Sequence, residues 1–264
     1  MDIEIEGLRI AYERAGEGPP LVLLHGYVGD GRGTWRRQID ELSEEFTVVA
    51  WDAPGAGRSS DPPESFRLAD YADCLAGFVD ALGLRGPHVV GLSFGGGLAL
   101  ELYRRHPTIP KSLVLAGAYA GWAGSLPPEV VELRLRQALE LADLPPDQLV
   151  RAILPTLFSE SAPGELVDEL AANMSDFHPA GLRAMARSFA EADLREALPS
   201  IDVPTLLLYG DRDVRAPLGV AEDLHAAIPA SRLVVMPGVG HVSCVEAAER
   251  FNAEVRAFLR SVKN

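Results

Sequence analysis

Cysteine is scarce in this chain of 264 residues, which contains only Cys74 and Cys244. Two cysteines cannot form a disulfide framework, and neither belongs to a C-x-x-C pair or to a Cys/His cluster of the kind that binds metals. Buried free thiols in a reducing cytoplasm are the simplest interpretation. The sequence therefore predicts no metal site.

Basic residues are also few, with 24 Lys and Arg against 38 Asp and Glu, which gives a formal net charge of −14. This balance argues against nucleic acid or an anionic membrane as a partner, because both require basic patches. No apolar run approaches the roughly 20 residues that span a bilayer, and the first residues lack the pattern of a signal peptide. We expect a cytoplasmic monomer or homodimer that acts on a small molecule.

Apolar runs alternate with helical stretches over most of the chain, and the composition of 47% hydrophobic and 23% charged residues is typical of a globular protein. Strands are expected at residues 3–5, 8–12, 21–24, 47–51, 89–91, 112–116, 204–209 and 232–236. Helices are expected at residues 35–46, 68–82, 98–106 and 246–260. The first two strands predict an antiparallel hairpin. The later alternation predicts a mostly parallel sheet with helices on both faces.

The alternation stops at Tyr119, and no convincing strand pattern returns before about Leu198. Four helical stretches take its place, separated by Pro and Gly. They cover residues 128–142, 146–157, 164–175 and 180–191. This pattern predicts an all-helical cap, residues 119–197, inserted into a core made of residues 1–118 and 198–264.

A serine with glycine two places away on each side follows one of the predicted strands, in Gly91-Leu92-Ser93-Phe94-Gly95. A tight turn from strand to helix at this motif holds the serine in a strained conformation, with its hydroxyl above the sheet edge. The glycines allow the two backbones to approach closely, and the N-terminus of the next helix favours negative charge. Ser93 is therefore a candidate nucleophile. An incidental serine in a glycine-rich turn would share this short motif. The residues at the other strand ends therefore have to distinguish a nucleophile from an incidental serine.

Two later strand ends carry the partners that a serine nucleophile needs. Asp211 and Asp213 follow the strand 204–209, and His241 follows the strand 232–236. Histidine can take the serine proton near neutral pH, and a buried carboxylate can orient its ring. We favour Asp213, which lies far enough along the loop to turn back over the sheet. Asp211 is expected to make a turn hydrogen bond.

Two backbone N–H groups are expected to stabilise an oxyanion at this site. One belongs to Phe94, directly after Ser93, and the other to Tyr27, in the loop after the strand 21–24. His25 and Gly26 shape that loop, and Gly26 lets the backbone come close to a substrate. Asp52, at the end of the strand 47–51, is expected to stabilise a turn together with Arg58.

Taken together, these motifs resemble the α/β-hydrolase superfamily. The resemblance rests on His25-Gly26, Asp52-x-Pro54-Gly55-x-Gly57-x-Ser59, Gly91-x-Ser93-x-Gly95-Gly96, Gly210-x-x-Asp213 and Gly240-His241. It implies the α/β-hydrolase fold, with a mostly parallel eight-stranded sheet, and a Ser93–Asp213–His241 triad. A serine in place of the aspartate of haloalkane dehalogenases and epoxide hydrolases argues against those two chemistries.

The junction between cap and core is similar to that of the 3-oxoadipate enol-lactonase group, which general esterases and C–C bond hydrolases partly share. The similarity lies in residues 189–195, 201–204 and 241–246. We therefore expect a cofactor-free serine hydrolase of a carboxylic ester or lactone. A C–C bond hydrolase, a perhydrolase or lyase on the same triad, and a non-catalytic ligand receptor remain alternatives.

The substrate pocket is expected to lie under the cap. Candidate residues for it are His25, Trp122, Leu126, Leu157, Phe158 and Phe177. An anionic lactone would need a basic group from the cap. Arg134, Arg136, Arg151, Arg183 and Arg187 are available for this role.

Overall fold

A computed structural model describes residues 1–174 and 177–262, and within these ranges the strands form a single eight-stranded sheet. The strands are β1 (Asp2–Ile5), β2 (Leu8–Ala15), β3 (Pro20–Leu24), β4 (Thr47–Trp51), β5 (His88–Leu92), β6 (Ser112–Ala116), β7 (Thr205–Gly210) and β8 (Ser231–Met236). Their order across the sheet is β1-β2-β4-β3-β5-β6-β7-β8. This confirms the expected eight-stranded sheet.

All strand pairs from β4 to β8 are parallel, whereas β1 pairs antiparallel with β2, and β2 antiparallel with β4. The predicted hairpin is therefore present at one edge. Every residue of β4, β5, β6 and β7 is buried, because helices cover both faces of the parallel part. The edge strand β8 is only partly buried. The carboxyl ends of the parallel strands meet along one edge of the sheet, where the site is expected.

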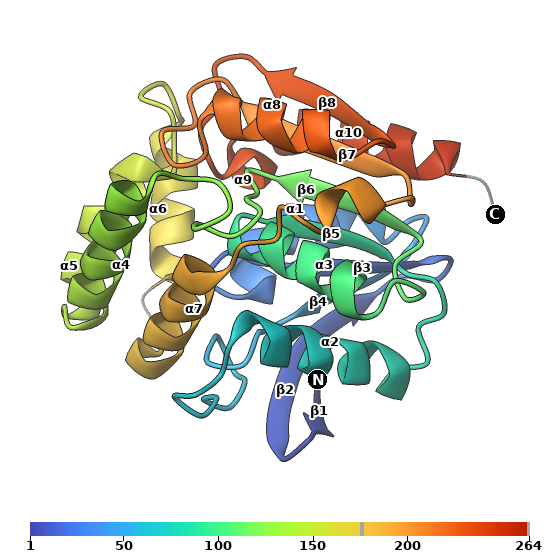
Figure 1. The fold of residues 1–264 in the computed structure, drawn as a ribbon, viewed down its shortest axis with the longest axis horizontal. Helices are drawn as coiled ribbons and strands as arrows, with labels where there is room; N and C mark the ends of the chain where they lie inside the picture. The colour runs from blue at the N-terminus through green and yellow to red at the C-terminus, as the bar shows by residue number, and fades with distance from the viewer. Residues whose placement is uncertain (175–176, 263–264) are drawn as a thin grey trace.

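Helices cover the two faces of the sheet (Figure 1). They are α1 (Gly31–Leu42), α2 (Leu68–Ala81), α3 (Phe94–Arg105), α8 (Leu218–Ala227), α9 (Ser243–Glu246) and α10 (Ala248–Ser261), with a 3-10 turn η2 (Leu198–Ser200). Contacts join α1 with α9 and α10, and α2 with α3. Buried apolar side chains of these helices and of the sheet form one continuous core.

Several helices differ from the sequence-based expectation, and α3 begins at Phe94 rather than at residue 98. The first begins four residues early, at Gly31, because the Asp30 carboxylate accepts a hydrogen bond from the N–H of Gly33 at 2.6 Å and caps the helix. The last helix is divided in two at Ala247, whose φ of −131° and ψ of 48° are not helical. Helix α8 was not expected.

The chain between β6 and β7 carries α4 (Pro128–Ala142), α5 (Pro146–Ile153), a 3-10 turn η1 (Leu154–Thr156), α6 (Gly164–Asn173) and α7 (Pro179–Glu191). We call residues 119–197 the helical insertion. Figure 1 shows α4–α7 gathered on one side of the molecule. The four helices occupy the predicted stretches, although the predicted end of the third, at residue 175, lies outside the described residues.

The two ends of the helical insertion are joined to each other. The N–H of Leu194 donates to the C=O of Ala120 at 2.9 Å, and the N–H of Trp122 donates to the C=O of Phe189 at 2.9 Å. We call this pair of segments, residues 120–122 and 189–194, the neck. The insertion therefore enters and leaves the core at one point.

Candidate active site

Ser93 is placed by the tight turn between β5 and α3. Its φ of 53° and ψ of −111° are unusual for a residue other than glycine, and α3 begins at the next residue. A Cβ on Gly91 would lie 2.2 Å from the carbonyl oxygen of Gly95, and a Cβ on Gly95 would lie 2.2 Å from that of Leu24. Only glycine fits at both positions, which explains the spacing of the motif.

His241 and Asp213 come from the loops after β8 and β7 and meet in the interior. The Nδ1 of His241 lies 2.8 Å from the Oδ2 of Asp213, and their side chains are 3% and 1% exposed. The other carboxylate oxygen, Oδ1, accepts hydrogen bonds from the N–H groups of Arg215 and Ala216, both at 2.8 Å. Both oxygens of Asp213 therefore have hydrogen-bond partners, and one of these partners is the ring of His241.

Asp211 contacts a different part of the loops than Asp213 does. Its Oδ1 accepts a hydrogen bond from the N–H of Gly238 at 2.7 Å, which ties the loop after β7 to the loop after β8. It has the turn contact that was expected for it. Asp52 also has its expected contact, because its Oδ2 accepts a hydrogen bond from the N–H of Arg58 at 3.0 Å.

Gly117, directly after β6, packs against the His241–Asp213 pair. A Cβ at this position would lie 3.0 Å from Nδ1 of His241 and 3.2 Å from Oδ2 of Asp213. Its φ of 49° also favours glycine. The absence of a side chain here leaves room for the imidazole–carboxylate contact.

Ser93 and His241 line the same narrow cavity, which has a volume of about 30 Å³. Its other lining residues are mostly apolar. They are Gly26, Tyr27, Val28, Thr34, Leu92, Ile153, Leu157, Leu170, Met174, Arg215, Val242 and Val245. The helical insertion supplies Ile153, Leu157, Leu170 and Met174, so the core and the insertion together enclose the space beside the Ser93 hydroxyl.

Two backbone donors beside Ser93 have no partner within the part of the chain that the structure describes. Among the described residues, no oxygen accepts a hydrogen bond from the N–H of Tyr27 or of Phe94. Gly26 lies close by, since a Cβ on it would be 3.8 Å from the Cβ of Ser93. Unpaired N–H groups beside a nucleophile are the groups that bind a developing oxyanion.

His25 fixes the shape of the Tyr27 loop. Its Nε2 accepts a hydrogen bond from the N–H of Ala53 at 3.0 Å, and therefore its Nδ1 carries the proton and donates to the C=O of Gly26 at 2.5 Å. The ring is buried with both nitrogens occupied by backbone. His25 thus shapes the loop, as expected, but has no group left for a substrate.

The basic residue at this cavity is Arg215, which the sequence analysis did not single out. It follows Asp213 by two residues, and its guanidinium donates to the hydroxyls of Tyr27 at 2.6 Å and Thr156 at 3.0 Å. The only signal in the sequence was its position on the loop that carries the acid.

Arg134, a candidate for binding an anionic substrate, instead supports the loop of Arg215. It donates to the backbone C=O of Arg215 at 2.7 Å and to the Tyr119 hydroxyl at 2.8 Å. That hydroxyl also donates to the same C=O. Burial raises the pKa of Tyr119 to about 12, so the hydroxyl keeps its proton at neutral pH. The Arg134 guanidinium therefore contacts Tyr119 and Arg215 rather than lining the cavity at Ser93.

The helical insertion also contacts the loop of His241. The N–H of Val242 donates to the C=O of Leu157 at 3.0 Å, and the Glu246 carboxylate accepts from the N–H groups of Gly240 at 2.9 Å and Ser159 at 3.1 Å. A Cβ on Gly240 would lie 2.6 Å from the backbone of Phe158 and Ser159. The two segments are therefore packed backbone to backbone.

Three further candidates for the pocket lie elsewhere. Trp122 is buried against the rings of Tyr27 and Phe189. Phe158 lines a wider surface depression beside Asp211. Phe177 lies beside the loop at Gly55, in a pocket that shares Tyr27, Val28 and Met174 with the cavity at Ser93. These three candidates are not among the described residues that line the cavity at Ser93.

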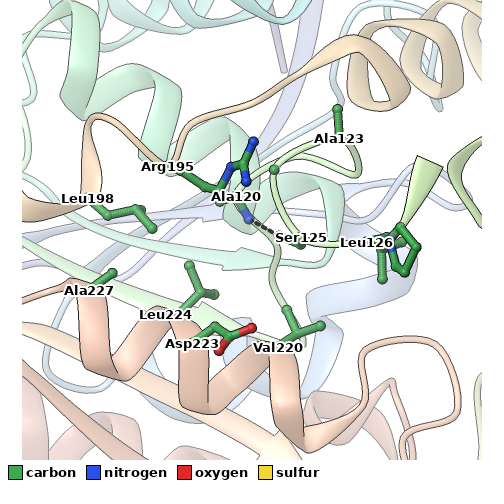
Figure 2. Close-up of a pocket in the computed structure, with 12 residues that line it drawn as sticks. Ala120, Ala123, Ser125, Leu126, Arg195, Leu198, Val220, Asp223, Leu224 and Ala227 are labelled. Carbon is green, nitrogen blue, oxygen red and sulfur yellow. Dashed lines mark hydrogen bonds between the residues drawn. The ribbon is translucent and has the colours of Figure 1, made fainter.

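Leu126 lines a separate cavity of about 430 Å³ between the neck, η2 and α8. Figure 2 shows Arg195 and Asp223 among its side chains, and Ser125, whose hydroxyl accepts a hydrogen bond from the N–H of Ala120. Arg195 already forms an ion pair with Asp193 at 2.5 Å. Neither Ser93 nor His241 lies at this cavity, so its larger size does not connect it with the nucleophile.

Within the described residues, no group of three or more His, Cys, Asp or Glu side chains is arranged to hold a metal ion. No helix in the same ranges combines the length and the apolar character needed to cross a membrane. Both cysteines are free and buried, as expected, and burial raises the pKa of each thiol to about 12. The cysteines are therefore protonated and unreactive at neutral pH.

Comparison with known proteins gives a matching family together with similar esterases and an enol-lactonase. The model of the alpha/beta hydrolase family matches residues 21–254. A thermophilic esterase from Thermogutta terrifontis, solved with malate bound, is 31% identical, with a TM-score of 0.90 over 100% of this chain and 97% of that chain. The enol-lactonase from Burkholderia xenovorans LB400 is 25% identical, with a TM-score of 0.90 over 99% of this chain and 100% of that chain. A pimeloyl-[acyl-carrier protein] methyl ester esterase from Vibrio vulnificus is 29% identical over 94% of this chain and 96% of its own length.

Proposed function

The chain belongs to the alpha/beta hydrolase family, and we propose that within this family it is a serine hydrolase that cleaves a carboxylic ester or a lactone. One observation carries the proposal. Ser93, in its strained turn, lines the same cavity as His241, whose ring is held by the buried carboxylate of Asp213. A nucleophile, a base and an orienting acid in this arrangement are suited to acyl transfer.

In the proposed reaction, Ser93 Oγ attacks the carbonyl carbon while Nε2 of His241 takes its proton. Asp213 accepts from Nδ1, which leaves Nε2 free as the base and stabilises the imidazolium that forms. The imidazolium then gives its proton to the leaving alkoxide, and an acyl-enzyme remains on Ser93. A water molecule, activated by His241, releases the acid and restores the serine.

The N–H groups of Tyr27 and Phe94 are proposed to hold the oxyanion of both tetrahedral intermediates. Their lack of partners among the described residues and their position beside Ser93 support this role. Removal of one such donor in a comparable enzyme costs about 3–4 kcal/mol of transition-state stabilisation. The positive end of α3 favours the same charge.

The helical insertion is proposed to act as a cap over the pocket. Its residues Ile153, Leu157, Leu170 and Met174 contribute an apolar surface to the cavity at Ser93, which supports a role in selecting the acyl or alcohol group. The esterases and the enol-lactonase among the similar proteins support ester or lactone bonds as the reaction class.

A fluorophosphonate and an ester panel test this proposal. We expect a fluorophosphonate to label the protein on Ser93, and the protein to turn over short acyl esters or lactones many times. Ser93→Ala is expected to remove the label and to lower kcat by about 10⁴- to 10⁶-fold with the fold intact. Labelling that persists in Ser93→Ala, or an absence of multiple turnover across the whole panel, would reject the proposal.

A further inference from the structure

Arg215 brings a positive charge to the cavity that holds Ser93 and His241. Its guanidinium donates to two neutral oxygens, the hydroxyls of Tyr27 and Thr156, and lies over the Tyr27 ring, 5.5 Å from the ring centroid. Among the described residues, no carboxylate forms an ion pair with it. The nearby Asp213 uses its oxygens for His241 and for two backbone N–H groups, one of them from Arg215 itself.

Many other arginines of this protein have a carboxylate partner. Arg37, Arg104 and Arg105, for example, each form an ion pair with a carboxylate at 2.5–2.8 Å. A partly buried guanidinium without a carboxylate loses hydration and gains no opposite charge in return. Such a group is stabilised when an anion enters the cavity, because a charge-assisted hydrogen bond then replaces the missing partner.

The backbone around Arg215 holds the side chain toward the cavity. Its N–H donates to Asp213 at 2.8 Å, and its C=O accepts from Arg134 at 2.7 Å and from the Tyr119 hydroxyl. Contacts on both sides of the residue fix its position relative to the His241–Asp213 pair. The guanidinium has five N–H donors, and the two hydroxyls use one each. Donors therefore remain for a ligand.

We propose that Arg215 binds a carboxylate of the substrate, so that the preferred ester or lactone carries a carboxylate on a short apolar chain. This inference rests on the proposed function, because it assigns the substrate class of the same site. The planar guanidinium matches the two oxygens of a carboxylate, and always carries its charge. The remaining lining, which includes Val28, Leu157 and Val242, accommodates the methylene groups between that carboxylate and the reacting carbonyl.

Two matched pairs of esters test the proposal and identify the side of the ester that carries the charge. Monomethyl glutarate and methyl pentanoate differ by a carboxylate in place of a methyl group on the acyl side. The acetate ester of 4-hydroxybutanoate and butyl acetate differ in the same way on the alcohol side. The wild type is expected to hydrolyse the charged member of one pair about ten- to hundred-fold more efficiently in kcat/KM, the range that one hydrogen bond to a charged group provides.

Arg215→Met keeps an unbranched apolar side chain and removes the guanidinium with its charge, and it is expected to abolish that preference while the neutral ester changes by only a few-fold. Arg212→Met is the matched control, because Arg212 lies on the same loop with its side chain 70% exposed. It is expected to keep the full preference. Arg215→Lys, which retains the charge but not the planar fork, is expected to keep part of it and provides a second variant if Arg215→Met does not fold.

The outcomes separate the two proposals. Equal efficiency of the wild type on both members of both pairs would overturn the assignment of Arg215. Equal losses of kcat/KM on charged and neutral esters in Arg215→Met would show that Arg215 stabilises the local structure and does not bind the carboxylate. If the fluorophosphonate does not label Ser93, the proposed reaction fails. The subsite is then tested by glutarate, which should raise the Tm of the wild type but not that of Arg215→Met.

Discussion

The carboxylate of Glu246 accepts hydrogen bonds from both the N–H and the hydroxyl of Ser159, a residue of the helical insertion. It also accepts from the N–H of Gly240, the residue before His241. On the other side of the histidine, the N–H of Val242 donates to the C=O of Leu157. The insertion therefore holds the His241 loop on both sides, and Glu246 is a positioning residue for the imidazole.

Glu246→Gln is expected to lower the free energy of unfolding by about 1–3 kcal/mol. The donors of Ser159 and Gly240 now share two carboxylate oxygens, whereas the amide of glutamine has only one acceptor oxygen. The substitution is also expected to lower kcat more than it changes KM, since His241 loses its fixed position. Urea unfolding and ester kinetics measure the two effects. Glu249→Gln, at an exposed site three residues later, is the control. Unchanged kcat in Glu246→Gln would remove Glu246 from its positioning role.

The two aspartates of the loop after β7 are expected to respond differently to the same change. Asp213→Asn should lower kcat by about 10⁴-fold, because the amide favours the wrong tautomer of His241. Asp211→Asn should mainly lower stability, since the described contacts of the Asp211 carboxylate are with the N–H of Gly238 and with Arg212, away from His241. Steady-state kinetics and thermal unfolding of both variants provide the measurement. A reversed pair of effects would assign the acid to Asp211.

Gly117→Ala is expected to damage the His241–Asp213 contact, because its Cβ would lie 3.0 Å from Nδ1 and 3.2 Å from Oδ2. Gly83→Ala is a matched control, since Gly83 also has a positive φ, of 66°, but no atom lies within 4 Å of its Cβ position. Both variants should lose roughly 1 kcal/mol of stability from backbone strain. Only Gly117→Ala should also lose most of kcat, and full activity in that variant would contradict the packing described above.

His88 makes folding stability dependent on pH. Burial, with a smaller contribution from Lys111, lowers its folded pKa to about 4, below the ordinary value of 6.5. The unfolded chain therefore takes up the proton first, so this stability is fully present above pH 6.5 and is lost as the pH falls from there toward 4. Between pH 7 and pH 5 the loss is about 2 kcal/mol.

His88→Gln should remove this part of the acid sensitivity, because glutamine does not titrate. Unfolding free energies of the wild type and of His88→Gln at pH 7 and pH 5 measure it. His225→Gln, at an exposed position on α8, is expected to keep the pH dependence of the wild type. Parallel curves for the wild type and His88→Gln would show that another group is responsible.

The strand pattern and the turn at Ser93 were predictable because local rules determine them. The glycines beside Ser93 are required by backbone contacts of 2.2 Å, and this requirement is visible as a spacing in the sequence. Asp213 and His241 were found from strand ends, since parallel strands bring their carboxyl ends to one edge. Helix α8 could also have been found, because Pro217 precedes it and Ala221 and Leu224 share a face.

The lining of the pocket could not be predicted in the same way. Arg134 and Arg215 are both arginines near the site, and only the path of the loop after Asp213 decides which one reaches the cavity. His25 similarly lies beside the nucleophile, but two backbone contacts use its ring nitrogens. The division of the last helix at Ala247 has no Gly or Pro to mark it. These features depend on contacts between distant segments.

Because the two ends of the helical insertion meet at the neck, we expect that the insertion can be exchanged as a unit. The chain enters it at Ala120 and leaves it at Leu194, and the N–H and C=O of these two residues are one hydrogen bond apart, at 2.9 Å. A segment from a related protein whose own ends meet in the same way can be joined there without altering the order of the strands. The transplanted segment needs donors for Glu246 to keep His241 in place. We therefore expect that exchange of the insertion would replace the four apolar residues that it contributes to the cavity, while Ser93, Asp213, His241 and Arg215 stay in the core.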